Sequence, residues 1–113
     1  MSLDITFTHD KCPHCGHAPE YMGFNITHNL GRMAEACDVY HTLWRPEEIG
    51  ISIAGQMIEP LRQAVARLKA SPEHFRQFDS PNGWGLYVNF LPFCEKVLAY
   101  CIANPNARVE ANR

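Results

Sequence analysis

The apolar residues of this chain follow two different periods, and this change of period is what most constrains the fold. From Leu3 to Thr8 apolar and polar side chains alternate, which is typical of a half-buried strand. From about Leu30 onward the apolar residues recur every three or four positions, as in amphipathic helices. The chain has 113 residues, enough for one hydrophobic core. We therefore expect a single domain with an α+β fold.

Strands are expected at both ends of the chain and helices between them. Residues 21–27 indicate a second strand, with a bulge at Gly23 that would bring Tyr21 and Phe24 into phase. Residues 107–111 can return as an edge strand, whereas Gly50 weakens the candidate strand 49–53. About three principal helices are predicted, near residues 30–43, 57–68 and 86–101, with a short helix at 72–78. The pattern predicts helices on one face of a small antiparallel sheet of two or three strands.

The charge balance is close to neutral, with ten Lys and Arg against 12 Asp and Glu. The chain therefore lacks the basic footprint of a nucleic-acid-binding protein, and we expect no nucleic-acid partner. No segment approaches the run of about 20 apolar residues that spans a bilayer, so we expect no membrane partner. Five Cys residues, an odd number, argue against a disulfide framework and favour a cytoplasmic location.

The segment 1–20 carries a run of Cys and His that resembles a zinc knuckle. Cys12 and Cys15 are three positions apart, so that their thiolates can take two corners of a tetrahedral site. His17 and His9 are the nearest candidates for the remaining ligands. Such a thiolate-rich site leaves no open position for water, and we therefore predict that the zinc is structural.

Other interpretations of the cysteines stay open. Cys37 and His41 are four positions apart and would share one face of a helix, so they could complete the zinc site instead. The apolar stripe that contains Cys37 favours a place in the core. Cys12 and Cys15 could also be plain reduced thiols or a redox pair, although the following Gly-His-Ala-Pro does not continue as a helix.

Polar and aromatic residues gather in three further clusters, at 25–30, 43–48 and 82–85. Helix capping, a surface ion pair and a tight turn around Trp84 would explain them structurally. If the three junctions meet at one end of the helices, they form a polar ligand-binding pocket. The candidate ligand-binding residues are Asn25, His28, Asn29, Arg45, Glu48, Asn82 and Trp84.

In combination, Asn25-Ile26-Thr27-His28-Asn29-Leu30, Leu43-Trp44-Arg45-Pro46-Glu47-Glu48 and Asn82-Gly83-Trp84-Gly85 resemble a family of small proteins encoded by phages and prophages. The resemblance covers about residues 21–113, so the cysteine knuckle is an N-terminal addition to it. It implies a phage or prophage setting and the host cytosol, and it assigns no catalytic residue.

Three functions are consistent with the sequence. The first is a non-enzymatic binding protein that sequesters a host protein or a nucleotide-like defence signal, an analogy drawn at the level of the family. The second is a zinc-stapled interaction or assembly module, which could be a homodimer. The third is a small hydrolase that uses His28 with Glu47 or Glu48.

The zinc prediction has a direct test. A chelator should lower the melting temperature, because the free energy of metal binding is part of the free energy of folding. An unchanged melting temperature, together with no zinc in elemental analysis of the purified protein, would contradict it.

Overall fold

The computed structural model describes residues 2–8, 22–79, 83 and 85–112. In chain order its elements, with η for 3-10 helices, are β1 (Ser2–Thr8), β2 (Met22–Thr27), η1 (His28–Leu30), α1 (Gly31–Ala36), α2 (Tyr40–Trp44), η2 (Pro46–Ile49), η3 (Ala54–Met57), α3 (Ile58–Ala70), α4 (Pro72–Arg76), α5 (Tyr87–Ala103) and β3 (Arg108–Asn112). The predicted α+β class is confirmed. The helical part is divided into more and shorter helices than the three expected.

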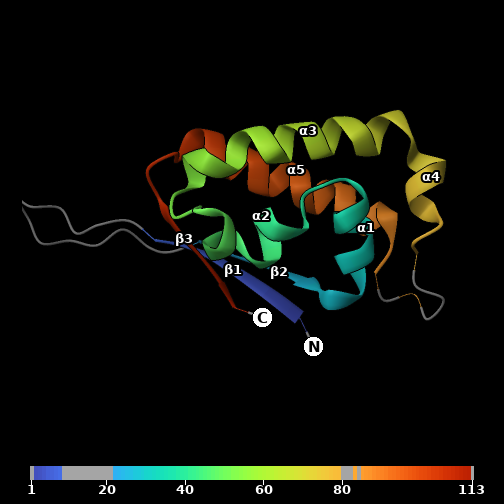
Figure 1. The fold of residues 1–113 in the computed structure, drawn as a ribbon, viewed down its shortest axis with the longest axis horizontal. Helices are drawn as coiled ribbons and strands as arrows, with labels where there is room; N and C mark the ends of the chain where they lie inside the picture. Colours follow the sequence, from blue (N-terminus) through green and yellow to red (C-terminus); the bar gives the residue numbers. More distant parts are fainter. Residues whose placement is uncertain (1, 9–21, 80–82, 84, 113) are drawn as a thin grey trace, which may run out of the picture.

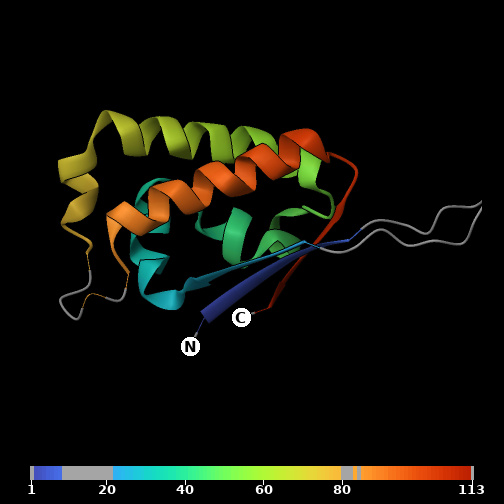
Figure 2. The ribbon, with the colours of Figure 1, turned by 180° about the vertical axis from the view of Figure 1, so that it is seen from behind.

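The sheet has β1 at its centre, in the order β2-β1-β3, and both neighbours are antiparallel to it. Leu3, Ile5 and Phe7 are fully buried, whereas Asp4 and Thr8 are exposed. Figures 1 and 2 show the helices gathered on one face of the sheet, which is the face that these apolar residues supply. The alternation in the sequence therefore predicted the orientation of the central strand correctly.

The pairing of β1 with β2 contains no bulge. The register runs without interruption from Ser2 opposite Thr27 to Phe7 opposite Met22. Phe24 and Ile26 keep the period of two on their own, and both pack on the core. The prediction of a bulge at Gly23 is therefore wrong.

The two long helices, α3 and α5, run antiparallel above the sheet (Figures 1 and 2). Pro60 lies in the first turn of α3, where its missing N–H costs nothing, and Pro92 lies inside α5. Cys94 and Cys101 of α5 are fully buried free thiols, as the apolar pattern predicted.

The helix expected over 30–43 is broken in two at residues 37–39. Residues 37 and 39 would lie about 200° apart around a continuous helix, on opposite sides of it. Cys37 and Val39 are nevertheless both fully buried, because Asp38 adopts a left-handed backbone with φ of 60°. Asp tolerates this conformation better than most residues. Arg67 supports the break by donating from Nη1 to the carbonyl of Cys37 at 3.0 Å.

Residues 49–53, which were expected as a possible strand, do not form one. Gly50 adopts a φ of 75° and ends η2, so the alternation of Ile residues is interrupted where Gly was expected to weaken it. Ile53 forms a single bridge with Arg108, and Ser52 accepts a hydrogen bond from the backbone N–H of Val109 at 3.0 Å. These contacts tie the segment to β3 without making it a strand.

Candidate functional site

The first polar cluster forms the junction between β2 and η1. The hydroxyl of Thr27 accepts a hydrogen bond from the backbone N–H of Asn29 at 3.4 Å, so Thr27 is the capping residue. His28 then stands at the first position of η1 with a half-buried side chain. Capping explains Thr27, but it gives no reason for an imidazole next to it.

The reason is a hydrogen bond between the first and the second cluster. Nε1 of Trp44 donates to Nδ1 of His28 at 2.8 Å. Trp44 lies at the end of α2 and is only 2% exposed, so its N–H needs a partner within the protein. The bond requires an unprotonated Nδ1 on His28. Two motifs that are separate in the sequence are therefore joined directly.

The second cluster continues outward from Trp44 to the surface. The ring of Tyr40 stacks on that of Trp44, with centroids 5.5 Å apart and planes 4° from parallel. Arg45 donates from Nε to the hydroxyl of Tyr40 at 3.3 Å and from Nη1 to Oε2 of Glu48 at 2.7 Å. The hydrogen bonds with Glu48 and then Tyr40 raise the pKa of Arg45 above its usual value, so the guanidinium stays charged. About 38% of the Arg45 side chain is exposed.

The third cluster touches the first through Gly85. Its φ is 115°, and an ideally placed Cβ at this position would lie 2.9 Å from the Cβ of Asn29. Glycine is therefore needed for both the backbone conformation and the close approach. The candidates Asn82 and Trp84 lie outside the described residues.

Asn25 lies on the exposed face of the sheet. Its Nδ2 donates to Oδ1 of Asp4 on the neighbouring strand at 2.6 Å. The structure thus brings His28, Arg45 and Glu48 into one bonded cluster with Trp44 and Tyr40, which we call the His28–Glu48 cluster. Asn29 is next to His28 in the chain and lies close to Gly85, outside these bonds. The members of the cluster spend their hydrogen bonds largely on one another, and the ligand-binding role of these residues stays a prediction.

The predicted zinc ligands Cys12, Cys15, His17 and His9 lie outside the described residues, so zinc binding stays a prediction as well. Within the described ranges, no three His, Cys, Asp or Glu side chains are grouped to hold a metal. Burial raises the pKa of the Cys37 thiol to about 11, and its Sγ donates to the carbonyl of Ala34 at 3.6 Å. Cys37 is fully buried in the core, and its alternative role as a zinc ligand with His41 stays a prediction.

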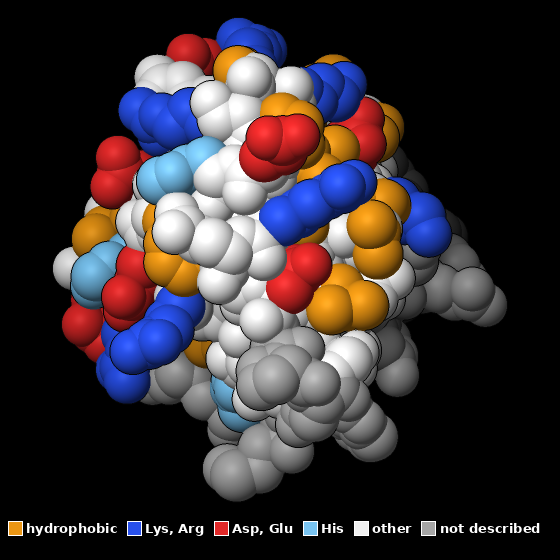
Figure 3. Space-filling view, turned by 90° about the vertical axis from the view of Figure 1, so that its right-hand side faces the viewer, with side chains coloured by type: hydrophobic (Ala, Val, Ile, Leu, Met, Phe, Trp, Pro, Cys, Tyr) orange, Lys and Arg blue, Asp and Glu red, His pale blue; other side chains and the backbone are white. Residues whose placement is uncertain are grey.

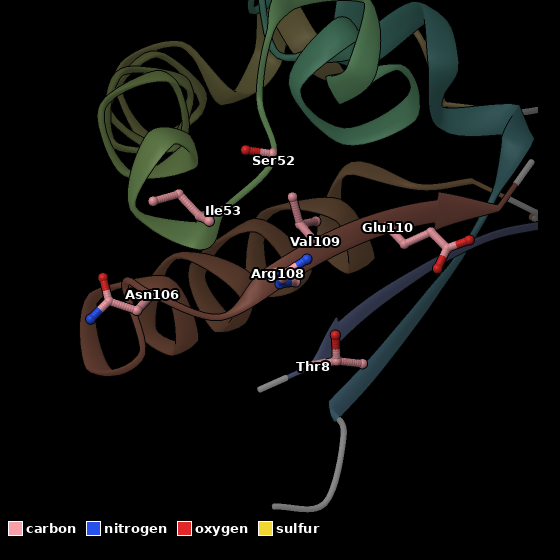
Figure 4. A pocket seen from close by; sticks show the side chains of 7 residues that line it. All are labelled: Thr8, Ser52, Ile53, Asn106, Arg108, Val109 and Glu110. Carbon is pink, nitrogen blue, oxygen red and sulfur yellow. The ribbon is translucent and has the colours of Figure 1, made fainter. Parts of the chain in front are cut away.

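A groove of about 620 Å³ lies elsewhere, along β3, and no pattern in the sequence predicts it. Figure 4 shows side chains from the end of β1, from the segment before η3 and from the C-terminal part of the chain around this groove. The lining residues are Thr8, Ser52, Ile53, Asn106, Arg108, Val109 and Glu110. We call it the β3 groove.

The walls of the β3 groove are held by backbone hydrogen bonds. The N–H of Ala54 donates to the carbonyl of Ala107 at 2.8 Å, and that of Gly55 to the carbonyl of Pro105 at 2.8 Å. Oε1 of Gln56 accepts from the backbone N–H groups of Ser52 at 2.7 Å and Ile53 at 3.1 Å. These hydrogen bonds hold segment 52–56 next to residues 105–107, which lead into β3. The backbone on this side of the groove is therefore fixed in place.

No sequence motif marks the β3 groove, because its polar residues come from three segments that are far apart in the sequence. Arg108 stands opposite Thr8 only through the register of β1 with β3. The period of two in residues 107–111 indicated an edge strand, but an alternation does not tell which neighbour a strand pairs with.

No known protein family matches the chain, and neither a curated protein nor a solved structure is significantly similar to it. Among the described residues, none of the helices combines the length and the apolar run that crossing a bilayer requires. Figure 3, which faces the end of the molecule near α4, shows positive and negative side chains interspersed rather than one basic patch.

The bond between His28 and Trp44 predicts a specific pattern of stability. His28→Ala should lower the free energy of unfolding by about 1–3 kcal/mol, because the N–H of Trp44 loses its acceptor. His28→Asn should recover most of this loss, since its Oδ1 can replace Nδ1. Urea denaturation followed by tryptophan fluorescence measures both, and equal destabilisation by the two variants would contradict the assignment.

The contact of Gly85 with Asn29 gives a second prediction. Gly85→Ala should destabilise the protein by roughly 2–4 kcal/mol, because the methyl group adds a clash to a strained backbone. Gly23→Ala is the matched control: nothing lies within 4 Å of its ideal Cβ. This control should change the stability by less than about 1 kcal/mol. Similar denaturation midpoints for both variants would show that residue 85 tolerates a side chain.

Proposed function

We propose that the protein is a non-enzymatic binding protein that holds a small anionic ligand of the nucleotide class in the β3 groove. The observation that carries this proposal is the groove itself. Its volume of about 620 Å³ lies within the range of about 300–1,000 Å³ typical of small-ligand sites. Polar residues from three segments line it, and one of them is Arg108.

The lining residues suit different parts of such a ligand. Arg108 offers a planar set of N–H donors, which is the geometry that binds phosphate through two hydrogen bonds. Glu110 lies two positions further along β3, on the same side of the strand, and can accept hydrogen bonds from sugar hydroxyls. Ile53 and Val109 supply apolar surface between the polar groups. A ligand with a phosphate at one end and hydroxyls at the other matches the hydrogen-bonding character of these two side chains.

The resemblance to phage and prophage proteins supplies the setting of the proposal. In the cytoplasm of an infected cell, a protein that binds a nucleotide without converting it would sequester a host defence signal. The hydrolase alternative has less support, because the hydrogen bonds of His28 and Glu48 go to Trp44 and Arg45.

The His28–Glu48 cluster is a second candidate site for the same ligand. The specific observation in its favour is that two sequence motifs converge there and a third touches it, with Arg45 half-exposed beside two stacked aromatic rings. The two sites make opposite predictions about which arginine matters, so one experiment separates them.

Isothermal titration of the full chain with a panel of mononucleotides and cyclic dinucleotides tests the proposal. Arg108→Gln should weaken binding about tenfold or more, the loss expected when a charge-assisted hydrogen bond is removed. Arg62→Gln is the control, because Arg62 is exposed and pairs only with Glu59 in the described structure. The recovered nucleotide should be unchanged.

Three results would count against the proposal. If no nucleotide of the panel binds, the ligand class is wrong. If Arg45→Gln abolishes binding and Arg108→Gln does not, the ligand lies at the His28–Glu48 cluster. If the nucleotide is converted to product, the protein is an enzyme.

A further inference from the structure

A second groove lies at the opposite edge of the sheet. β2 is an outer strand, and within the described residues its strand partner is β1 alone. The outer side of an edge strand carries backbone N–H and C=O groups that can pair with a further strand. An ideal Cβ on Gly23 would have nothing within 4 Å, so the face of the sheet has room for a side chain at this position of β2.

The groove has a volume of about 420 Å³ and runs between Gly23–Ile26 and the first half of α5. Phe24 and Phe93 form its aromatic floor, edge to face with centroids 6.4 Å apart. Val88 and Pro92 line it from α5, one helical turn apart. Val88 is 55% exposed, which is unusual for a large apolar side chain beside an aromatic floor.

Two features of the groove favour a peptide over a purely apolar occupant. Pro92 has no N–H, so the helical hydrogen bond to the carbonyl of Val88 cannot form. Lys96 lies one turn further along α5 and is the one charged residue among the described residues that line the groove. No ion pair between described residues involves Lys96. The groove therefore offers a backbone edge, an apolar wall and a cation.

We propose that this groove binds an extended peptide of another protein, which adds to β2 as a further strand. Its alternate apolar side chains pack on Phe24, Val88 and Pro92, and an acidic side chain pairs with Lys96. Strand addition of this kind takes affinity from backbone hydrogen bonds and specificity from the pockets for alternate side chains. The site is independent of the β3 groove, because β2 and β3 are the two opposite edges of the sheet.

A second copy of the chain is a poorer occupant. Pairing β2 with the β2 of another copy would bring in Met22–Thr27, which contains no carboxylate for Lys96. It would also present Phe24 and Ile26, which already pack on their own core. The charge of the groove thus favours a different chain with an acidic residue.

The test is selection of a random ten-residue peptide library on the immobilised full chain, followed by fluorescence anisotropy of the enriched peptides. Val88→Asp and Lys96→Glu should each weaken binding about tenfold or more. Ile102→Asp is the matched control, since Ile102 is 54% exposed on the same helix but does not line the groove. Melting curves establish that all three variants are folded.

The decisive arm exchanges the charges. A peptide whose acidic residue is replaced by Lys should bind Lys96→Glu better than it binds the original protein, and N-methylation of alternate peptide bonds should abolish binding. The proposal is overturned if selection enriches no peptide, or if the enriched peptides bind Val88→Asp and Lys96→Glu unchanged. It is also overturned if sedimentation shows a dimer that Val88→Asp dissociates, because a second copy then fills the groove.

Discussion

The register of β1 against its two neighbours is the constraint on which the rest of the structure depends. Leu3, Ile5 and Phe7 all point to the helices and are fully buried, so a slip by one position would expose all three. The same register sets Thr8 opposite Arg108 on one side and Gly23–Ile26 along the other. The β3 groove and the groove beside β2 both follow from how this strand is paired.

The hydrogen bond from Trp44 to His28 has a comparable role in the helical part. It connects the end of α2 to the beginning of η1, and the stacked ring of Tyr40 extends the connection to Arg45 and Glu48. Gly85 closes against Asn29 from the loop before α5. These contacts connect α2, η1 and the loop before α5, which are far apart in the sequence. They explain why the motifs at these positions contain these particular side chains.

Much of the fold could be predicted because local periods carry it. The alternation in β1 and the stripes of α3 and α5 reflect burial directly, so they were assigned correctly. The break at Asp38 could not be predicted, because the apolar spacing around it still matches a helix, and the left-handed turn depends on Arg67 from a distant segment. The prediction of a bulge at Gly23 was wrong because Phe24 and Ile26 both face the core in an uninterrupted register with β1.

The candidate site was predictable only in part. The sequence identified His28, Arg45 and Glu48 as chemically unusual, and the structure joins them through Trp44 and Tyr40. The sequence contains no sign of the β3 groove, because its residues meet through the register of the sheet.

The proposal that a nucleotide occupies the β3 groove is tested by a ¹⁵N-HSQC titration of the labelled protein with the nucleotide that binds best. If a nucleotide occupies the β3 groove, the amide signals of residues 8, 52–53 and 106–110 should shift. Shifts confined to residues 28–48 would contradict the proposal, as would a spectrum that does not change.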